Sequence, residues 1–478
     1  MPSPADAGQP TLADAQPPIA LGTLDGRYRQ AVAALVDHLS EPALNRERLR
    51  VEVEWLIHLT DHAVVPGVGR LTDAEKAALR GIPENFGPDD IAALAAGEAV
   101  TQHDVKAVEY FLKERFAALP GRATDPTAEL IHFGCTSEDV NNLAYALMVR
   151  GAITQVWLPR ANALLAQLET MARDLRDVPL LAHTHGQPAT PTTMGKELAV
   201  LAWRLGRQLR RVEGAEFLGK FNGATGTYGA HLAAVPGADW QAISHDFVTA
   251  LGLAWNPLTT QIESHDWQAE LYADLARANR ILHNLCTDVW TYISLGYFAQ
   301  VRGQGTVGSS TMPHKVNPIR FENAEANLEV SNALLDVLAT TLVTSRLQRD
   351  LTDSSMQRNI GTAIGHSLLA IDNIGRGLSG LDAAPQAMAA DLDGNWEVLA
   401  EPIQSAMRAL AAQGVAGMDA PYERLKELTR GRRIGADDLR AFIDGLGLPE
   451  DVAGRLRTLT PATYVGLAPS LVDHLGPA

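Results

Sequence analysis

The sequence has little cysteine, no excess of basic residues and no long apolar run. The two cysteines, Cys135 and Cys286, are too few for a disulfide framework or a cysteine-rich zinc site, and we expect two reduced thiols. Asp and Glu number 56 against 40 Lys and Arg, a formal net charge of -16. Such a chain would repel nucleic-acid phosphates overall, so no nucleic-acid partner is expected. No window approaches 18 uninterrupted apolar residues, so we expect no membrane span.

The first 18 residues also lack the features of a targeting signal. They are rich in Pro and Ala, and they contain neither a basic region nor an apolar one. We therefore expect a disordered tail over residues 1–18 and a cytoplasmic location. The remaining chain is of ordinary globular composition, with 46% hydrophobic and 20% charged residues.

Strand patterns are scarce, and helical patterns dominate. Residues 178–183 and 289–294 resemble strands in isolation, but no alternation of strand and helix recurs, which disfavours a doubly wound sheet. Apolar residues recur at helical spacing over much longer stretches. The sequence therefore predicts an all-α fold with helices over residues 45–59, 157–175, 195–213, 267–296, 322–347 and 360–378.

Composition shifts near residues 120–125 and 383–385 indicate the domain boundaries. We expect an N-terminal helical domain over residues 19–124, a central domain of long helices over 125–383 and a C-terminal helical domain over 384–478. Long helices need partners along their whole length to bury their apolar stripes, so a bundle is expected in the centre.

Polar residues concentrate between the expected helices, where sites tend to lie. His103 and Asp104 precede the helical pattern AVEYFLKERF, and a capping role suits Asp104. Thr136 or Ser137, with Glu138 close behind, gives an approximate capping box. The N–H groups left free at that helix start also suit an anion.

The segment 181–193 contains His183 and His185 in an H-x-H pattern. Metal-dependent hydrolases use such a pair, but they need further ligands at strand ends, which an all-helical chain does not supply. We therefore expect no metal ion. His183 suits a structural role, whereas His185 lies in a Pro- and Thr-rich loop where exposure suits proton transfer.

Two further segments stand out, one for its glycines and the other for its arginines. Gly303, Gly305 and Gly308 match G-x-G-x-x-G, but Ser-Ser-Thr and two prolines follow, so a hinged loop is favoured over a dinucleotide site. Within residues 345–359, arginines lie among hydroxyl residues. They form either a solvated helix face or a bidentate grip on phosphate or carboxylate.

The run GSSTMPHKVNP, residues 308–318, resembles the signature GSSxMPxKxNP of the fumarase/aspartase superfamily. The runs HTHGQPATPTTMGKE, TSEDVNN, QHDVKAVEYFLKE, SRLQRDLTDSS and NWEVLAEPIQ resemble bacterial adenylosuccinate lyases, and the similarity extends from residues 24–28 to 462–464. The resemblance implies a three-domain all-α fold whose central helices assemble into a homotetramer core, with active sites shared between chains. It also implies β-elimination of fumarate from adenylosuccinate and from the succinyl-aminoimidazole carboxamide ribotide (SAICAR), without a cofactor.

The same resemblance assigns roles to individual residues. His185 matches the general acid, Ser309 the general base and Glu322 the carboxylate that orients the catalytic histidine. Because serine is a poor base, it needs activation, which we assign to loop N–H groups and Lys315. Five positions match family residues that bind the succinyl carboxylates, and we call this set the succinyl grip: Thr136, Ser137, Gln261, Lys315 and Asn317. Positions matching the nucleotide side are Arg27, Tyr28, His103, Arg349, Ser354 and Arg358, with Asp104, Ser310 and Asn323 as further substrate contacts.

One position departs from the family pattern, because Gln102 stands where Asn is expected before His-Asp. Two other functions stay open at this point: another lyase of the superfamily, such as an argininosuccinate lyase, and a helical scaffold without catalysis. Phosphate-side residues, such as Arg349 and Arg358, are superfluous for substrates without phosphate. Retention of His185 together with Ser309 argues against a silent scaffold.

Overall fold

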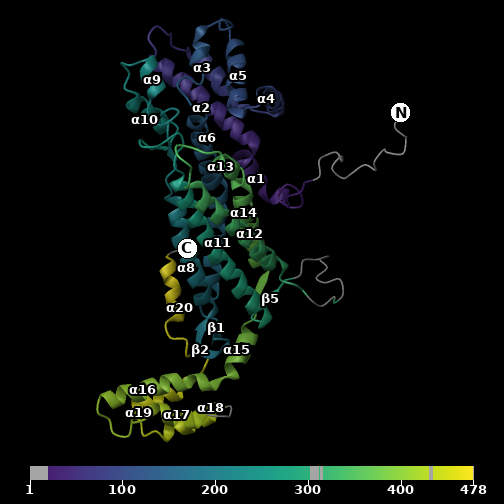
Figure 1. The fold of residues 1–478 in the computed structure, drawn as a ribbon. Coiled ribbons are helices and arrows are strands. Elements are labelled where there is room, and N and C mark those ends of the chain that lie inside the picture. The colour runs from purple at the N-terminus through teal and green to yellow at the C-terminus, as the bar shows by residue number, and fades with distance from the viewer. Residues whose placement is uncertain (1–19, 302–311, 313–315, 430–433, 477–478) are drawn as a thin grey trace. The chain divides into compact units, whose positions relative to one another are not determined.

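The computed structural model describes residues 20–301, 312, 316–429 and 434–476, and their regular structure is almost entirely helical (Figure 1). The predicted all-α fold is confirmed, and the strands are short. The tail expected over residues 1–18 lies outside the described residues. In the described part of the chain, no helix is long and apolar enough to cross a membrane.

The chain divides into two compact units, each built from separate stretches. The first unit contains Met1–Ala161, Gln208–Arg280 and Ala326–Asp372, and the second contains Asn162–Arg207, Ile281–Glu325 and Asn373–Ala478. These units are discontinuous in sequence, whereas the expected boundaries cut the chain into consecutive pieces. The three-domain division at residues 124/125 and 383/384 therefore stays a prediction.

The long helices follow the predicted ranges closely. They are α2 (Glu41–Asp61), α7 (Leu158–Asp174), α8 (Met194–Glu213), α11 (Asp266–Ser294), α12 (Ile319–Leu342) and α14 (Ile360–Leu378). Residues 289–294 lie inside α11, so their strand-like pattern was misleading. Helix α12 ends before the predicted residue 347. Beyond it, Asp350 accepts hydrogen bonds from Arg346 and donates its own N–H to Ser345, and such local bonds compete with a helix.

The first unit is organised around α2, which is buried on several sides. Trp55 of α2 packs on Phe221 and Phe247 at ring-centroid distances of 4.3 and 4.9 Å, and α2 contacts α3, α5 and α6. The other elements of the first unit are α1 (Arg29–Leu39), α3 (Asp73–Glu84), α4 (Pro88–Thr101), α5 (Asp104–Ala117), η3 (Pro126–Leu130), α6 (Ser137–Gly151), η4 (Ala152–Trp157), β3 (Leu218–Gly219), α9 (Gly229–Ala234), α10 (Trp240–Ala250), β4 (Ala254–Trp255) and α13 (Thr352–Gln357). Strands β3 and β4 form a short parallel pair.

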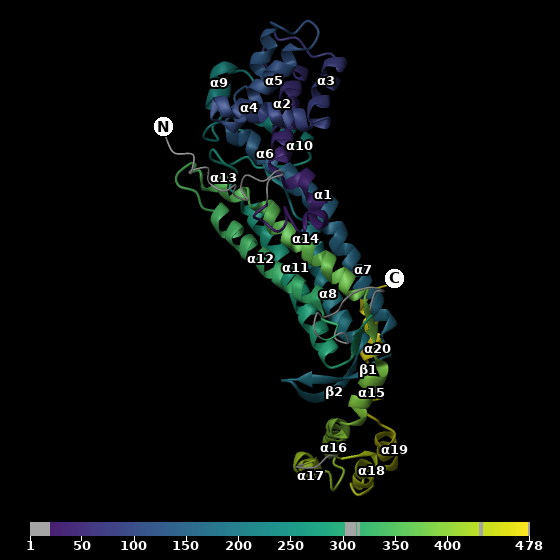
Figure 2. The same ribbon diagram turned by 90° about the vertical axis from the view of Figure 1, so that its right-hand side faces the viewer.

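The second unit contains a hairpin and a group of small helices. Strands β1 (Pro179–Thr184) and β2 (Gln187–Thr193) pair antiparallel, as do β5 (Phe298–Gln300) and β6 (Leu381–Ala383). The remaining elements are α15 (Pro385–Asp393), η5 (Trp396–Leu399), α16 (Ala400–Ala412), α17 (Pro421–Thr429), α18 (Ala436–Asp444), α19 (Glu450–Arg457), α20 (Ala468–Leu471) and η6 (Val472–Leu475). Figure 2 shows α16 to α19 gathered together, around a core that includes Ile403, Met407, Leu439 and Ile443. Strand β1 confirms the strand-like reading of residues 178–183.

Close packing of α8 on the end of α7 generates a test of the fold. A Cβ on Gly195 would lie 2.3 Å from the carbonyl oxygen of Ala172 and 2.5 Å from the backbone nitrogen of Arg176. Because backbone atoms cannot move aside cheaply, Gly195→Ala should destabilise the protein by about 1–3 kcal/mol, the usual cost of overpacking. Urea unfolding would measure it. The control is Gly454→Ala in α19, where nothing lies within 4 Å of the new Cβ. Equal midpoints for the two variants would contradict this account of the packing.

Candidate active site

Helix α6 begins at Ser137, and its N-cap is Thr136, one of the two residues that the capping pattern allowed. The N–H of Thr136 donates to Oδ2 of Asp139 at 2.8 Å, so the reciprocal carboxylate is Asp139 and not Glu138. Thr136 and Ser137 are half-buried at the first turn. Their position at a helix N-terminus, where N–H groups and the helix dipole favour negative charge, suits a carboxylate.

Glu138 is buried and turns instead toward an arginine. Nη2 of Arg349 lies 2.9 Å from Oε1 of Glu138 and donates to Oγ of Ser354 at 3.1 Å. Nη1 of Arg349 donates to Oε1 of Gln261 at 3.4 Å. Burial raises the pKa of Glu138, and the positive charge of Arg349 only partly opposes that shift. Gln261 thus lies beside Arg349 and Ser354, which follow it by about 90 residues in the sequence.

Asp104 is ion-paired rather than capping its helix. The N-cap of α5 is His103, whose Nδ1 accepts a hydrogen bond from the N–H of Lys106 at 3.2 Å. Oδ2 of Asp104 lies 2.7 Å from Nη2 of Arg48 and 3.4 Å from Nη2 of Arg358. Burial alone would raise the pKa of Asp104, but the charges and donors of the arginines outweigh it and lower the pKa. The N-cap is therefore His103 and not Asp104, although Oδ1 of Asp104 accepts the first-turn N–H of Val105 at 2.9 Å.

Gln102, the departure from the family pattern, caps the preceding helix. It has φ 52° at the end of α4, and its Nε2 donates to the carbonyl oxygen of Ala99 at 2.8 Å. The left-handed backbone is one that Asn adopts more readily than other residues with a Cβ. The side chain of Gln102 is therefore used within its own helix in this structure.

Asn141 joins the two arginine groups into one network. Its Nδ2 donates to Oε1 of Glu138 at 2.8 Å, and its Oδ1 accepts from Nε of Arg48 at 2.9 Å. The sequence analysis missed Arg48, Glu138 and Asn141 as members of this site. A signal existed for Arg48, because it lies four residues before Glu52 on the same face of α2, among apolar residues that this helix buries. Charged residues at buried helix positions indicate a polar network.

Arg27 and Tyr28 lie at the start of α1 in the same unit. Arg27 is exposed, and its guanidinium carbon is 5.8 Å from the centre of the Tyr28 ring. Tyr28 packs against the apolar cluster of Leu24, Val32 and Leu369. This packing fixes the tyrosine beside α14 and leaves the arginine free to reach a ligand.

In the second unit, His185 occupies the tip of the β1–β2 hairpin. Thr184 pairs with Gln187, so His185 and Gly186 form a two-residue loop, with φ 53° and 72°. Positive φ at both positions is the arrangement of a type I′ turn, whose twist matches that of the strands. The turn holds His185 exposed, as expected for a proton donor. Nε2 of His183 lies 4.0 Å from Oδ2 of Asp391.

Glu322 and Asn323 begin α12. Oε1 of the exposed Glu322 accepts a hydrogen bond from Nε1 of Trp290 at 3.2 Å, and Oδ1 of Asn323 accepts from Nδ2 of Asn373 at 3.0 Å. Asn317 is half-buried just before the helix. The orienting role of Glu322 toward a histidine stays a prediction. Three of the expected site residues lie outside the described residues, as do the loop glycines: Ser309, Ser310 and Lys315, with Gly303, Gly305 and Gly308.

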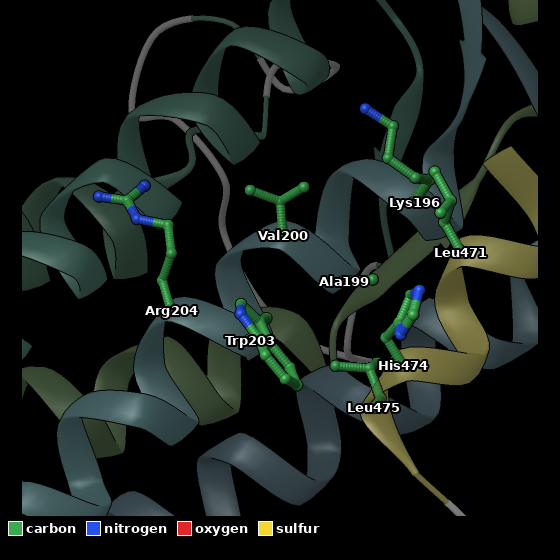
Figure 3. A pocket seen from close by; sticks show the side chains of 8 residues that line it. All are labelled: Lys196, Ala199, Val200, Trp203, Arg204, Leu471, His474 and Leu475. Carbon is green, nitrogen blue, oxygen red and sulfur yellow. The ribbon is translucent and has the colours of Figure 1, made fainter.

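Two cavities in the described part of the chain are not lined by any expected site residue. Figure 3 shows the first, of about 380 Å³, between α8 and the C-terminal segment; Trp203 and His474 line it with mostly apolar neighbours. The second, of about 340 Å³, is lined by residues that flank Gln261, such as Thr260 and Ile262. Among the residues that the structure describes, no group of three or more His, Cys, Asp or Glu side chains lies placed to hold a metal ion.

Comparison with solved structures defines the class of protein. A fumarate lyase from Mesorhizobium matches with a TM-score of 0.73 and 20% identity, covering 92% of this chain and 96% of that one. The 3-carboxy-cis,cis-muconate lactonizing enzyme of Pseudomonas putida matches with a TM-score of 0.67, 20% identity and coverage of 92% and 97%. At that identity, the likeness concerns the fold alone. The chain therefore has the fold that these two enzymes share.

Sequence comparison narrows the class to one family. The family model described as "Lyase" matches residues 26–330, and the one described as "Adenylosuccinate lyase C-terminal" matches residues 345–465. The adenylosuccinate lyase of Escherichia coli K12 is 49% identical over 95% of this chain and 98% of its own length. That of Vibrio cholerae is 47% identical with the same coverage. The chain belongs to the adenylosuccinate lyase family.

The arginine pairing of Asp104 generates a pH-dependent prediction. Because the folded pKa is below the usual 3.8, the pairing stabilises the protein above about pH 3.8 and is lost as the pH falls through the folded value. Asp104→Asn should therefore lower the urea midpoint at about pH 7, and the difference from wild type should shrink at about pH 3.5. The control is Asp451→Asn, at a largely exposed pair with Arg455. A difference that persists unchanged in acid would refute the assignment.

Proposed function

We propose that this protein removes fumarate from adenylosuccinate to give AMP, and makes the same cut in SAICAR to give the aminoimidazole carboxamide ribotide. Membership of the family supports the reaction. The structural observation that carries the proposal is the network of the first unit, which joins Gln261 to Arg349 and, through Glu138 and Asn141, to the Arg48–Asp104–Arg358 group. Groups suited to carboxylates and groups suited to phosphate thus lie in one network.

The reaction needs a base and an acid. Ser309, as the base, takes a proton from the succinyl carbon next to a carboxylate, and that carboxylate accommodates the developing negative charge. The carbon–nitrogen bond then breaks, and its electron pair goes to the nitrogen, which His185 protonates. Fumarate and the amine then leave. Ser309 releases the proton it took to solvent, and His185 takes up one proton from solvent, which restores the enzyme. Glu322 orients the catalytic histidine.

The substrate grip divides into two sides. Thr136 and Ser137, at the N-terminus of α6, bind the succinyl carboxylates together with Gln261, and Lys315 and Asn317 complete that side. On the nucleotide side, two planar guanidinium groups match phosphate geometry. This side comprises Arg27, Tyr28, His103, Arg349, Ser354 and Arg358, with Asp104, Ser310 and Asn323 as further contacts. No metal ion or cofactor takes part, since proton transfer and electrostatic stabilisation suffice. Both cysteines are free, which fits the cytoplasm.

A direct assay tests the function. Purified protein should split adenylosuccinate and SAICAR, followed by the change in absorbance of each, and should not split argininosuccinate, which carries no phosphate. Turnover of argininosuccinate at a higher rate than adenylosuccinate would overturn the proposal in favour of another lyase of the superfamily.

The hairpin supplies a variant that tests the acid without disturbing the fold. Asn is favoured at the positive-φ positions of a type I′ turn, so His185→Asn should keep the hairpin and the unfolding midpoint of wild type. It should lose at least about 10² in kcat, a typical contribution of a general acid. The matched control is His183→Asn, two residues before the tip residue His185 on β1, which should lose much less. Near-normal turnover by His185→Asn would remove this residue from the mechanism.

We further propose a homotetramer whose active sites are shared between chains. Its support is a set of apolar side chains that are exposed in the single chain on three long helices. Apolar side chains exposed along long helices suit packing against helices of a partner chain. They lie on α8 (Val200, Trp203), α11 (Trp290) and α12 (Val330, Val337).

Sharing of sites makes a numerical prediction. Chains carrying His185→Ala and chains carrying Ser309→Ala are mixed in equal amounts, denatured and refolded. If the two residues of one site come from different chains, each is intact with probability one half, and about a quarter of sites should recover. If they come from the same chain, no site is whole and activity stays at the background of the single variants. Recovery near that background from well-mixed tetramers would rule out sharing.

A further inference from the structure

Residues 220–224, which we call the brace, lie between two parts of the proposed succinyl grip. Lys220 and Asp139 form an ion pair at 2.8 Å, and both side chains are 0% exposed. Neither residue belongs to the proposed catalytic or binding set. A fully buried ion pair is costly to desolvate and contributes little net stability, so its presence calls for an account other than stability.

On one side, the brace is fixed to the first turns of α6. The carboxylate of Asp139 accepts the N–H groups of Asn222 at 3.0 Å and Gly223 at 3.1 Å, in addition to that of Thr136 at 2.8 Å. Asn142 bonds the backbone of Lys220 twice, accepting from its N–H at 2.8 Å and donating to its carbonyl oxygen at 3.0 Å. One carboxylate therefore holds both the brace and the N–H of Thr136.

On the other side, the brace holds the segment that carries Gln261. Nε2 of Gln261 donates to the carbonyl oxygen of Ala224 at 3.0 Å. Nδ2 of Asn222 donates to Oγ1 of Thr259 at 2.8 Å. The two ends of the proposed succinyl grip, Thr136 and Gln261, are thus tied to the same five residues.

Charge balance explains why Lys220 is needed. The Asp139 carboxylate accepts three backbone N–H groups, and a carboxylate buried in a dry interior is stabilised by an opposite charge. Lys220 supplies that charge, and its Nζ also donates to the carbonyl oxygen of Gly223 at 3.3 Å. We propose that the Lys220–Asp139 pair and the brace are positioning elements that set the spacing of Thr136 and Gln261 for the two succinyl carboxylates. This inference rests on the proposed function and identifies residues that act through the binding groups.

The test measures binding of two probes, fumarate and AMP, by calorimetry, and turnover of adenylosuccinate separately. The first variant is the double change Asp139→Asn with Lys220→Met, which removes both buried charges and leaves neither unpaired. An Asn has one acceptor oxygen instead of two, so the brace and Thr136 can no longer share it. The dissociation constant for fumarate should rise at least about tenfold, because misplaced groups lose binding and catalysis steeply. That for AMP should change less than about twofold, since AMP lacks the succinyl group.

A second, milder variant tests the brace even if the double variant does not fold. Thr259→Val keeps the shape of the side chain and removes the acceptor for Asn222, so it should weaken fumarate binding selectively. Its control is Thr260→Val, at the next and more exposed position. Lys76→Met, which breaks a pair with Asp61 at 2.6 Å on α3, is the control for loss of a paired lysine. Neither control should alter the affinity for fumarate.

The outcomes separate the two proposals. Selective loss of fumarate affinity in Thr259→Val and the folded double variant supports the brace. Unchanged fumarate affinity, or equal weakening of fumarate and AMP, overturns it and leaves the pair as a purely structural feature. A wild-type protein that binds fumarate but does not split adenylosuccinate refutes the proposed function and not the brace. A wild-type protein that binds neither probe overturns both.

Discussion

A carboxylate removed from water must face a cation or several N–H donors, and the polar part of the first unit is arranged around that constraint. Asp139 meets Lys220 and three backbone N–H groups. Glu138, the residue before it, meets Arg349, and Asp104 meets Arg48. Each pairing joins segments far apart in the sequence. The apolar contacts of α2 and α6 bring these segments together, and the buried charges then fix how they are oriented.

The same constraint orders the arginines of the proposed site through protein contacts alone. Two N–H groups of Arg349 already face Glu138, Ser354 and Gln261, so the guanidinium plane is set by protein contacts. A preorganised donor loses less side-chain entropy on binding than a free one does. The cost is a buried glutamate whose pKa is raised by desolvation. Such local destabilisation at a polar cluster is typical of a functional site.

Much of the fold could be predicted because long amphipathic helices carry their own periodic signal. Helix α14 begins and ends where the sequence predicted, at Ile360 and Leu378. The errors occur where short-range patterns are ambiguous. Residues 289–294 are rich in strand-forming side chains but continue α11, since packing along a long helix outweighs local propensity. Strand β2 was missed because its sequence, QPATPTT, contains two prolines, which are depleted in strands.

The site was predictable to different degrees for a physical reason. The position of His185 is determined locally: a two-residue turn with Gly186 places it at an exposed tip, and a short stretch of sequence contains that information. The position of Thr136 is determined by Asp139 and, through it, by Lys220 and Gly223, more than 80 residues further along the chain. No spacing rule in a single sequence relates such residues. Family resemblance predicts which groups touch the substrate, whereas the groups that hold those side chains in place became visible only in the fold. Arg48, Glu138 and Lys220 are residues that hold other side chains in place. In a single sequence, the signal for such a residue is a charged side chain among neighbours that are otherwise apolar and buried.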